Sequence, residues 1–485
     1  MSSSSIKHVI VKSNDLQDYL TDASFIRDGY AERVVLPENI DEVVSVLSEA
    51  NRDRVPVTVS GAGTGTVGGR VAFGGIVLAT DRLNHIKVID LTNFTSVAEA
   101  GVILSDFQRA VESEGLLYPP DPTERGCFLG GTVATNASGA RTFKYGPTRN
   151  YIAGLKVVLA SGEVLDLRRG ETRADAQGRI RVGSIDLQLP DLRRPATRKN
   201  ATGYFIAPEM DAIDLFIGSE GTLGVICEIT ARLLPKPHGL LSGVVFFSSE
   251  ADVLGLVADV RKHVDARAIE FFDRESLNFL RQKYSTIPAQ AVAALFFEQE
   301  TTPVSEESGL EQWMALLDHY HALGEDSWFA TAATDQAKLR EFRHQLPVLM
   351  NEWFAHYRQR KVSTDMAVPD DAFPGLFRLY QDTLRDSGLR YTIFGHIGDN
   401  HVHVNILPRD DAEGARAREL YVQFLKHAAA NGGTLSAEHG VGKLKREYLR
   451  LFYSDEQMRA LASIKRALDP NGILGRGNIF PEGML

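Results

Sequence analysis

The stretch "SGAGTGTVGGR", residues 60–70, follows an expected strand, "VPVTVS" (55–60), and contains five glycines in eleven residues. Glycine lets successive backbone N–H groups face one concavity without a Cβ in the way, and such a concavity binds phosphate oxygens. A Rossmann fingerprint would need a helix directly after these glycines, but "RVAFGGIVLAT" (70–80) predicts a turn and a strand. A Walker loop is also excluded, because no Gly-Lys-Ser/Thr follows. The loop is therefore either a phosphate cradle of another architecture or a glycine-rich hairpin without a ligand.

Two further glycine-rich stretches lie at wide spacing in the same half of the chain. They are "GCFLGGTVATNASGARTFKYG" (126–146) and "GSEGTLGVI" (218–226), and the second runs into an alternating strand pattern. One long anionic ligand that touches several loops would explain all three stretches together.

Composition and net charge indicate which kinds of binding partner are unfavourable for this chain. The chain has 485 residues, with 53 Lys and Arg against 63 Asp and Glu, for a net charge of −10. This balance argues against nucleic acid or an anionic membrane as the main partner. The longest apolar runs, such as "AVAALFF" (291–297), are far shorter than the roughly 20 residues of a membrane span.

The composition of the first residues and the small number of cysteines favour a reducing compartment for this protein. Residues 1–15 contain no apolar segment of signal-peptide length, and Cys127 and Cys227 are the only cysteines, so no disulfide framework is expected. We expect a cytoplasmic protein, with peripheral membrane attachment left open.

Breaks in the chain predict three units. "LLPKPHG" (233–239) follows a strand pattern, and "NGG" (431–433) is typical of a helix C-cap. The boundaries predict units of 1–238, 239–431 and 432–485. Within them, Ile40, Val43, Val44 and Leu47 form one helical face, and Ser454-x-x-Gln457 predicts a capping box that opens a helix ending before Pro470.

A histidine-rich stretch, "FGHIGDNHVHVN" (394–405), alternates polar and apolar residues like a strand hairpin. A tight turn at Asp399–Asn400 would place His396 opposite His403. Directly opposed side chains have Cβ atoms about 4.5–5.5 Å apart, so the two imidazoles could share a divalent ion. The alternative is a buried histidine strand satisfied by its own hydrogen bonds.

A carboxylate is needed to complete such a site, and "LSAEHGVGK" (435–443) offers Glu438 beside His439. Neighbours on a strand point to opposite sides, so both residues could bind one ion only if the glycines bend the chain. We therefore expect Glu438 to bind the ion and His439 to transfer protons.

The order of motifs resembles a known flavoprotein family. An expected strand, "SGAGTG", "PPDP", "LGGTVATNASG", "KYG", "RKNATGY" and "GSEGTLGVICE" follow one another as in the FAD-binding domain of the vanillyl-alcohol-oxidase/PCMH superfamily. The branch of D-lactate, D-2-hydroxyglutarate and glycolate dehydrogenases is the most similar, because its GHxGDGNxHxN and AEHGxG motifs match 395–405 and 437–442. One departure is Asn400-His401, where that motif has Gly-Asn.

The resemblance implies an α+β fold. Residues 1–238 would form a PCMH-type FAD-binding domain of two α/β subdomains. Residues 239–431 would form a mixed α+β, ferredoxin-like substrate or cap domain. Residues 432–485 would return to the FAD-binding domain and complete the active site.

The resemblance also implies the cofactor contacts. FAD would be bound non-covalently, because Thr64 stands where some relatives carry a flavin-linked histidine. "ILGRGN" (473–478) departs from the usual "ILNPGK", which leaves the last contact open. The implied FAD-binding residues are Gly61, Ala62, Gly63, Thr64, Gly65, Pro120, Gly131, Asn136, Gly139, Glu220, Gly224, Val225, Ile226 and Asn478.

The implied reaction is oxidation of a D-2-hydroxy acid, D-lactate first, to the 2-oxo acid. A Zn or Mn ion on His396, His403 and Glu438 would stabilise the alkoxide, His439 would remove the hydroxyl proton, and hydride would pass to flavin N5. Arg343 and Lys361 are candidates for holding the substrate carboxylate. His401 is expected to contact substrate or to replace His403 as a ligand. Ser363 occupies the position of a lysine in some relatives, which favours a lactate-sized substrate over a glutarate-sized one.

Other readings stay open at this point. A metallohydrolase would use the same histidine and carboxylate cluster, an alkyl-glycerone-phosphate synthase-like enzyme would use FAD without net oxidation, and a flavin sensor would need no such cluster. Within the favoured class, D-2-hydroxyglutarate or glycolate could replace D-lactate. A quinone, a cytochrome, an electron-transfer flavoprotein or oxygen could accept the electrons, and a homodimer is also open.

Overall fold

The structure is a computed structural model that describes residues 9–10, 14–192, 194–481 and 483–485. The interpretation of residues 1–15 as free of a signal peptide falls largely outside these ranges. Among the residues described, no helix is long and apolar enough to cross a membrane.

The first glycine stretch leaves the end of a small, mainly parallel sheet. The strands lie in the order β1-β2-β4-β3. Helix α1 packs on this sheet through the predicted apolar face, and the Asn39 side chain caps it by accepting from the Glu42 N–H. As expected, no helix lies between β3 and β4. The elements are β1 (Val9–Ile10), β2 (Arg33–Val35), α1 (Ile40–Asp53), β3 (Val57–Ser60) and β4 (Ile76–Ala79).

A second, antiparallel sheet carries the other two glycine stretches at its ends. Its order is β5-β6-β12-β8-β9. Helix α3 lies within the 126–146 stretch, and β12 begins where the 218–226 stretch ends. The strands are β5 (Ile86–Asp90), β6 (Thr95–Glu99), β8 (Ile152–Val158), β9 (Val164–Arg168) and β12 (Val225–Arg232); the helices are α2 (Leu104–Ser113), α3 (Leu129–Ala134), α4 (Thr142–Tyr145) and α5 (Ile213–Phe216). Two short pairs join β10 (Arg179–Val182) to β11 (Ile185–Gln188) and β7 (Leu116–Leu117) to β13 (Leu234–Pro235).

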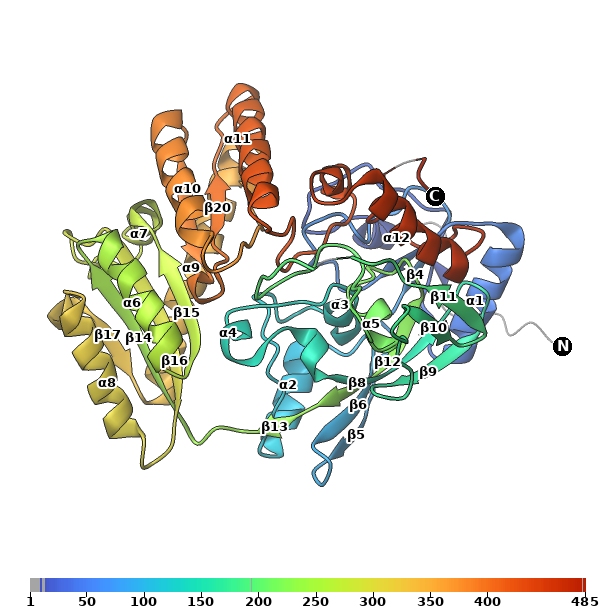
Figure 1. Cartoon of the computed structure of the whole chain (residues 1–485), viewed down its shortest axis with the longest axis horizontal. Helices are drawn as coiled ribbons and strands as arrows, with labels where there is room; N and C mark the ends of the chain where they lie inside the picture. The colour runs from blue at the N-terminus through green and yellow to red at the C-terminus, as the bar shows by residue number, and fades with distance from the viewer. Residues whose placement is uncertain (1–8, 11–13, 193, 482) are drawn as a thin grey trace.

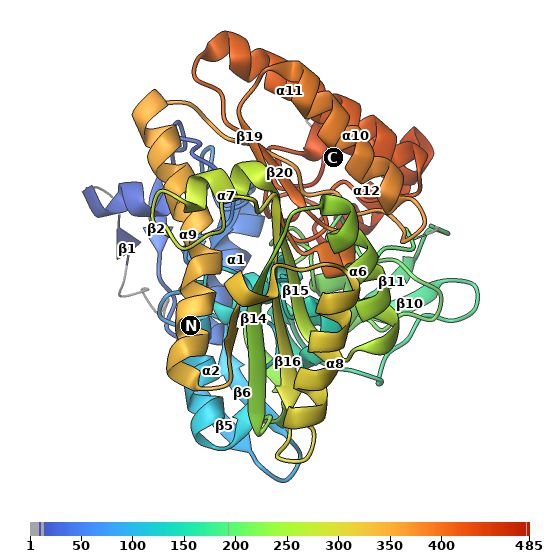
Figure 2. The same cartoon turned by 90° about the vertical axis from the view of Figure 1, so that its left-hand side faces the viewer.

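The third sheet is antiparallel and contains the histidine stretch. Its order is β17-β14-β16-β15-β19-β20-β18. Helices α6 and α8 pack on one face, whereas α7 and α9 pack on the other (Figure 2). The strands are β14 (Gly239–Phe247), β15 (Ala266–Phe272), β16 (Ala293–Thr301), β17 (Trp328–Ala330), β18 (Val362–Ser363), β19 (Tyr391–Gly395) and β20 (His403–Ile406). The helices are α6 (Glu250–His263), α7 (Arg274–Leu280), α8 (Glu306–His319), α9 (Ala333–Tyr357), α10 (Phe373–Ser387) and α11 (Asp411–Ala430).

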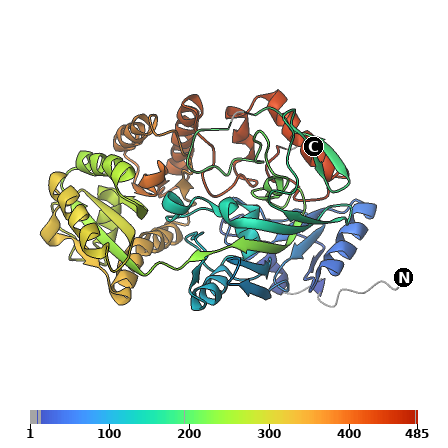
Figure 3. The ribbon, with the colours of Figure 1, turned by 60° about the horizontal axis from the view of Figure 1, so that its bottom comes forward.

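The C-terminal segment returns to the first sheet. The Val57 N–H donates to the Ile473 carbonyl at 2.8 Å, and Leu474 joins the apolar core beneath α1. Helix α12 (Asp455–Leu468) has the expected Ser454–Gln457 capping box. Figures 1 and 3 show α12 beside the N-terminal half and apart from the third sheet. The expected class is confirmed: two α/β layers, a mixed α+β unit and a returning C-terminal segment.

Candidate functional site

One cavity of about 480 Å³ lies between the glycine loops and the third sheet. Its volume is in the range typical of small-molecule and cofactor sites. All three glycine stretches reach it, and so do His403, Glu438 and His439. Segments far apart in the sequence therefore enclose a single space. The predicted site residues that line it are Gly61, Ala62, Gly63, Thr64, Gly65, Gly131, Glu220, Gly224, Ile226, His403, Glu438, His439 and Lys361.

Arg70 holds the first glycine loop in place. Its guanidinium donates to the carbonyl oxygens of Gly61 at 2.6 Å and Thr21 at 2.7 Å. Gly63 has φ +80°, and a Cβ there would lie 2.5 Å from the Arg70 guanidinium carbon. The loop is thus preorganised with a curvature that a larger residue at 63 would break.

Several predicted cofactor residues support the loops and do not line the cavity. Asn136 adopts φ +48° and accepts the Arg149 N–H at 3.0 Å, while Val225 is buried under α1. A Cβ on Gly139 would lie 2.0 Å from the Asp121 carbonyl, so only glycine fits. The Pro120 carbonyl accepts from Gln108, and Asn478 bridges Lys443 to the Gly69 carbonyl.

The cavity wall suits the phosphates and ring of a long cofactor. A Cβ built at Gly65 or Gly131 would meet no atom within 4 Å, so the backbone of both loops is open to a ligand. Thr64 also lines the cavity, and a threonine side chain cannot form a histidyl link to a flavin. The residues present therefore fit a non-covalently held FAD.

Glu220 ties the third glycine stretch to the segment that carries Glu438 and His439. Its carboxylate accepts the N–H groups of Val441 at 2.7 Å and Gly442 at 2.6 Å. Burial raises the pKa of Glu220 to about 7. This carboxyl thus positions the loop at the C-terminal side of the cavity.

The histidine hairpin forms with a different register from the predicted one. His403 pairs with Phe394, and not with His396. The predicted tight turn is wrong because a 3-10 turn at Ile397–Asp399 and left-handed Asn400, φ +54°, lengthen the loop. A shift of two residues keeps His403 on the expected face. His396 lies just after β19, where the turn brings its ring centroid to 5.7 Å from that of His403.

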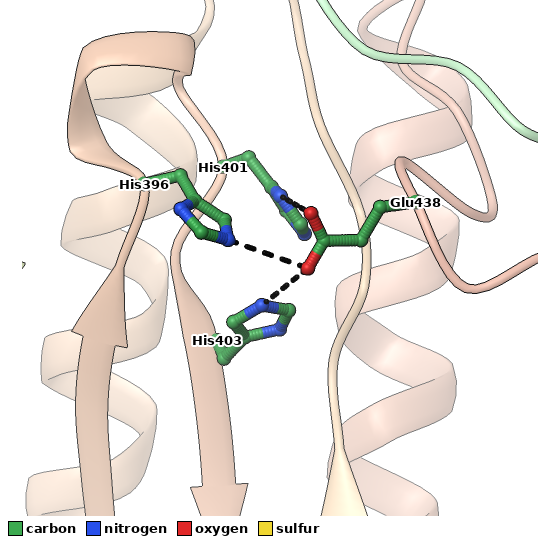
Figure 4. A group of neighbouring side chains, drawn as sticks. All are labelled: His396, His401, His403 and Glu438. Atoms are coloured by element: carbon green, nitrogen blue, oxygen red, sulfur yellow. Dashed lines mark hydrogen bonds and ion pairs between the residues drawn. The ribbon is translucent and has the colours of Figure 1, made fainter. Parts of the chain in front are cut away.

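Four side chains converge at the end of this hairpin. The Nε2 atoms of His396 and His403 lie 3.3 and 3.1 Å from Glu438 Oε1, and His401 Nδ1 lies 3.9 Å from Oε2 (Figure 4). One donor atom from each residue falls within 4.8 Å of the others. Histidine nitrogens and a carboxylate are the usual ligands of zinc and related ions. The donor set therefore fits a divalent metal.

Each imidazole is oriented by a second contact. His396 Nδ1 lies 2.6 Å from Glu270 Oε1, and His403 Nδ1 lies 3.0 Å from the Thr364 carbonyl. Such acceptors fix the N–H on that side of the ring and leave the other nitrogen free for a metal. Burial would raise the pKa of Glu270, but Arg343 and His396 hold it at about 2.

Buried charges surround the cluster. Fully buried Lys199 lies 3.2 Å from Glu438 and 3.4 Å from Asp399, and it donates to the Gly139 carbonyl at 3.0 Å. Burial would raise the pKa of Glu438, yet Lys199 and His396 hold it well below its usual value. Glu438 is thus ionised and available as a ligand.

His439 faces the cavity with a carboxylate at its back. Its Nδ1 lies 3.4 Å from Asp365 Oδ2, and Nε2 lies 3.6 Å from Glu438 Oε1. Burial lowers the pKa of His439, so the ring is neutral at pH 7 and able to accept a proton. Residues 435–443 do not form a strand. Gly440 and Gly442 have φ +80° and +51°, and these conformations bend the chain. Such a bend is what Glu438 and His439 require to approach one ion.

The candidates for substrate binding lie in different places. Lys361 lines the cavity and makes no salt bridge with any residue that the structure describes. Arg343 does not line the cavity, because its Nε donates to Glu270 Oε2 at 2.9 Å. His401 is fully buried and also does not line the cavity.

Sequence reasoning missed the carboxylates that organise the cluster. Asp365, in "STDMAVP", accepts from Lys445 at 2.6 Å and from the His439 N–H at 3.1 Å. Glu270 lies on β15, and its link to His396 spans 126 residues. A polar residue inside an apolar strand pattern, such as Glu270 in "AIEFF", is the signal that could have indicated a buried role.

Family comparisons match most of the chain. Residues 31–168 match the family described as FAD binding domain, and residues 237–479 match the family described as FAD linked oxidases, C-terminal domain.

Curated relatives match almost end to end. The chain is 31% identical to a D-lactate dehydrogenase of Anaerostipes hadrus, over 98% of this chain and 94% of that relative. It is 30% identical to the glycolate oxidase subunit GlcD of Bacillus subtilis, over 96% and 92%. It is 31% identical to a D-2-hydroxyglutarate dehydrogenase of Xanthomonas citri pv. viticola, over 92% and 89%.

Solved structures share the fold at low sequence identity. p-Cresol methylhydroxylase with substrate bound aligns with TM-score 0.71 and 16% identity, over 97% of this chain and 93% of that one. Alkyldihydroxyacetonephosphate synthase aligns with TM-score 0.69 and 16% identity, over 96% and 81%.

Proposed function

The chain belongs to the family of FAD-dependent D-2-hydroxyacid dehydrogenases, and on that premise we propose that it oxidises a D-2-hydroxy acid, with D-lactate the first candidate, to the 2-oxo acid. The metallohydrolase alternative is not consistent with membership of a family of FAD-dependent dehydrogenases. The synthase-like alternative rests on a fold likeness alone.

A single observation carries the proposal. The glycine loops that fit FAD and the cluster of His403, Glu438 and His439 line the same cavity. A substrate between them would touch the flavin on one side and the proton acceptor on the other. No glycine loop would be needed for hydrolysis at the same cluster.

The residues of the site have separate roles in the proposed reaction. His396, His403 and Glu438 would hold a divalent ion, Zn or Mn, which would lower the pKa of a hydroxyl near it. His439, neutral and facing the cavity, accepts the hydroxyl proton. Bound FAD supplies the acceptor for the hydride that leaves the substrate Cα. Asp365 positions His439 by accepting its backbone N–H at 3.1 Å.

Lys361 is our candidate for the substrate carboxylate. Lys361 lines the cavity, and its ammonium has no ion-pair partner in the described part of the chain. Ser363, two residues later, also lines the cavity where a lysine would favour a second carboxylate. This wall supports a small monocarboxylate over a glutarate-sized acid.

Other features remain part of the proposal. We propose domains at 1–238, 239–431 and 432–485 and a cytoplasmic setting, with peripheral membrane attachment and a homodimer both left open. A quinone, a cytochrome or an electron-transfer flavoprotein would accept the electrons.

Anaerobic flavin bleaching tests the function. The yellow protein would be mixed with D- and L-lactate, glycolate and D-2-hydroxyglutarate, and flavin absorbance followed with time. We expect D-lactate to bleach the flavin faster than L-lactate or D-2-hydroxyglutarate. Bleaching by D-2-hydroxyglutarate alone would refute the proposed substrate, and no bleaching by any of the acids would refute the reaction.

A further inference from the structure

We propose that His401 is a fourth protein ligand of the divalent ion, so that three imidazoles and one carboxylate hold it; this deepens the proposed function and rests on the ion assumed there. The residue takes the place of the asparagine in the GHxGDGNxHxN motif. The inference therefore concerns this chain's own substitution.

The position of His401 favours a ligand role over contact with substrate. Its exposed fraction is 0%, and its ring does not line the cavity that His403, Glu438 and His439 reach. The chain enters this position through Asn400 at φ +54°, a conformation that asparagine tolerates better than most residues. The His401 N–H donates to the His396 carbonyl at 3.2 Å, which closes the hairpin loop and fixes the backbone beside the cluster.

The nitrogen that faces the cluster carries a lone pair. His401 Nε2 lies 3.2 Å from Asp365 Oδ1. Asp365 is an acceptor only, because its carboxylate already receives Lys445 at 2.6 Å and the N–H groups of Glu438 and His439 at 3.2 and 3.1 Å. Proximity to this carboxylate favours the N–H on Nε2 and the lone pair on Nδ1. Neither ring nitrogen of His401 makes a hydrogen bond to a described residue, so Nδ1 is open toward Glu438.

The same reasoning applies to the other two rings. Glu270 and the Thr364 carbonyl accept from the Nδ1 side of His396 and His403, so both Nε2 lone pairs face Glu438. Three lone pairs then surround one carboxylate at 3.1, 3.3 and 3.9 Å. Acceptors at such distances repel one another unless a metal ion or shared protons lie between them.

Protons are a poor substitute for that cation. The ring centroids lie 4.5 to 5.7 Å apart. Two unit charges at 5 Å repel by about 3 kcal/mol at an effective dielectric of 20. Three imidazoliums beside buried Lys199 would add three such repulsions, whereas one divalent ion satisfies all four donors together. Figure 4 shows the donors directed at a common centre near the Glu438 oxygens.

The neighbouring group of Asp365, Glu438 and His439 does not offer a comparable site. Its donor atoms also lie within 4.8 Å of one another. Asp365, however, already receives the Lys445 ammonium, the Ser436 hydroxyl and two backbone N–H groups, so its charge is compensated without an ion. It orients His401 and His439, and the ion belongs between the three imidazoles and Glu438.

The extra imidazole changes which ion the site selects. A set of three nitrogens and one oxygen favours late first-row ions such as Zn²⁺ and Co²⁺, and it disfavours Mg²⁺ and Ca²⁺, which require oxygen ligands. It also leaves fewer positions for exchangeable ligands than a set of two imidazoles and one carboxylate would leave.

X-ray absorption spectroscopy at the zinc edge tests the assignment. The FAD-loaded protein, stripped with a chelator and reloaded with Zn²⁺, should show scattering from three imidazoles. His401→Asn should show two, and its Zn²⁺ affinity, measured by competition with a chromophoric chelator, should fall at least about tenfold. His344→Asn, a histidine outside the cluster, should keep three imidazoles and the parent affinity.

Two outcomes would overturn the proposal: two imidazoles in the parent, or an unchanged spectrum in His401→Asn. The parent spectrum decides the question even if the variant does not fold. Flavin bleaching is measured on the same sample. A spectrum with three imidazoles and no bleaching by any hydroxy acid would refute the proposed function but support His401 as a ligand. Bleaching together with only two imidazoles would support the function and refute His401 as a ligand.

Discussion

Replacement of Lys361 by methionine isolates the proposed carboxylate contact. Lys361 lines the cavity and its ammonium has no salt-bridge partner in the described ranges, so methionine removes the charge without leaving a buried partner unpaired. A hydrogen bond to a charged group contributes about 1.5–3 kcal/mol. Each 1.36 kcal/mol corresponds to tenfold, so a fully buried contact would raise the half-saturating concentration of substrate about 10- to 160-fold. Lys361 is exposed, and exposed ion pairs contribute about 0.2–1 kcal/mol, so the expected rise is about two- to fivefold.

Anaerobic stopped-flow reduction of the flavin over a range of D-lactate concentrations measures this effect. The half-saturating concentration should rise while the limiting rate changes little, because Lys361 does not contact His439 or Glu438 through any hydrogen bond or salt bridge in the described structure. Lys283→Met is the matched control, since its ammonium pairs with Glu341 at 3.2 Å on the surface. Unchanged saturation in Lys361→Met would refute the assignment, and the substrate carboxylate would then need another cation.

Three further predictions concern proton transfer, the ion and Glu220. His439→Ala should keep a folded, yellow protein but slow flavin reduction about 10²–10⁴-fold, whereas His344→Ala should reduce at the parent rate; equal rates in all three proteins would contradict the role of His439. Chelation should abolish reduction without bleaching or releasing the flavin, and Zn²⁺ or Mn²⁺ should restore it; reduction that persists after complete metal removal would count against the ion. Burial raises the pKa of Glu220 from 4.5 to about 7, so its contribution to stability is full below pH 4.5 and is lost as the pH rises to 7. The parent should therefore lose about 3 kcal/mol of unfolding free energy over that interval relative to Glu220→Gln, in unfolding curves measured across pH, and parallel pH profiles would contradict this account.

Local sequence patterns predicted the secondary structure correctly where interactions between residues close in sequence determine it. The apolar face of α1 and the capping box of α12 formed as expected, because helix periodicity and N-capping depend on residues within one or two turns. The first glycine loop also formed as a turn between two strands, as the absence of a helix signal indicated.

The hairpin register is a case where local reasoning was wrong. The sequence predicted His396 opposite His403, but the 3-10 turn and left-handed Asn400 placed His403 opposite Phe394. Turn geometry sets register, and it depends on contacts that a two-residue rule omits. The cluster still forms because a shift of two residues keeps His403 on the same face, and because the turn after β19 brings His396 close to it.

The sequence by itself determined that His396, His403, Glu438 and His439 belong to one site, because residue type and motif order carry that information. Only the tertiary structure decided that Glu270 and Asp365 orient the imidazoles and that Glu270 holds Arg343. It also decided that His401 is buried, whereas Lys361 lines the cavity. Those decisions depend on contacts between β15, α9 and the loops after β18 and α11. No local pattern encodes the distance between residues that lie more than 70 positions apart.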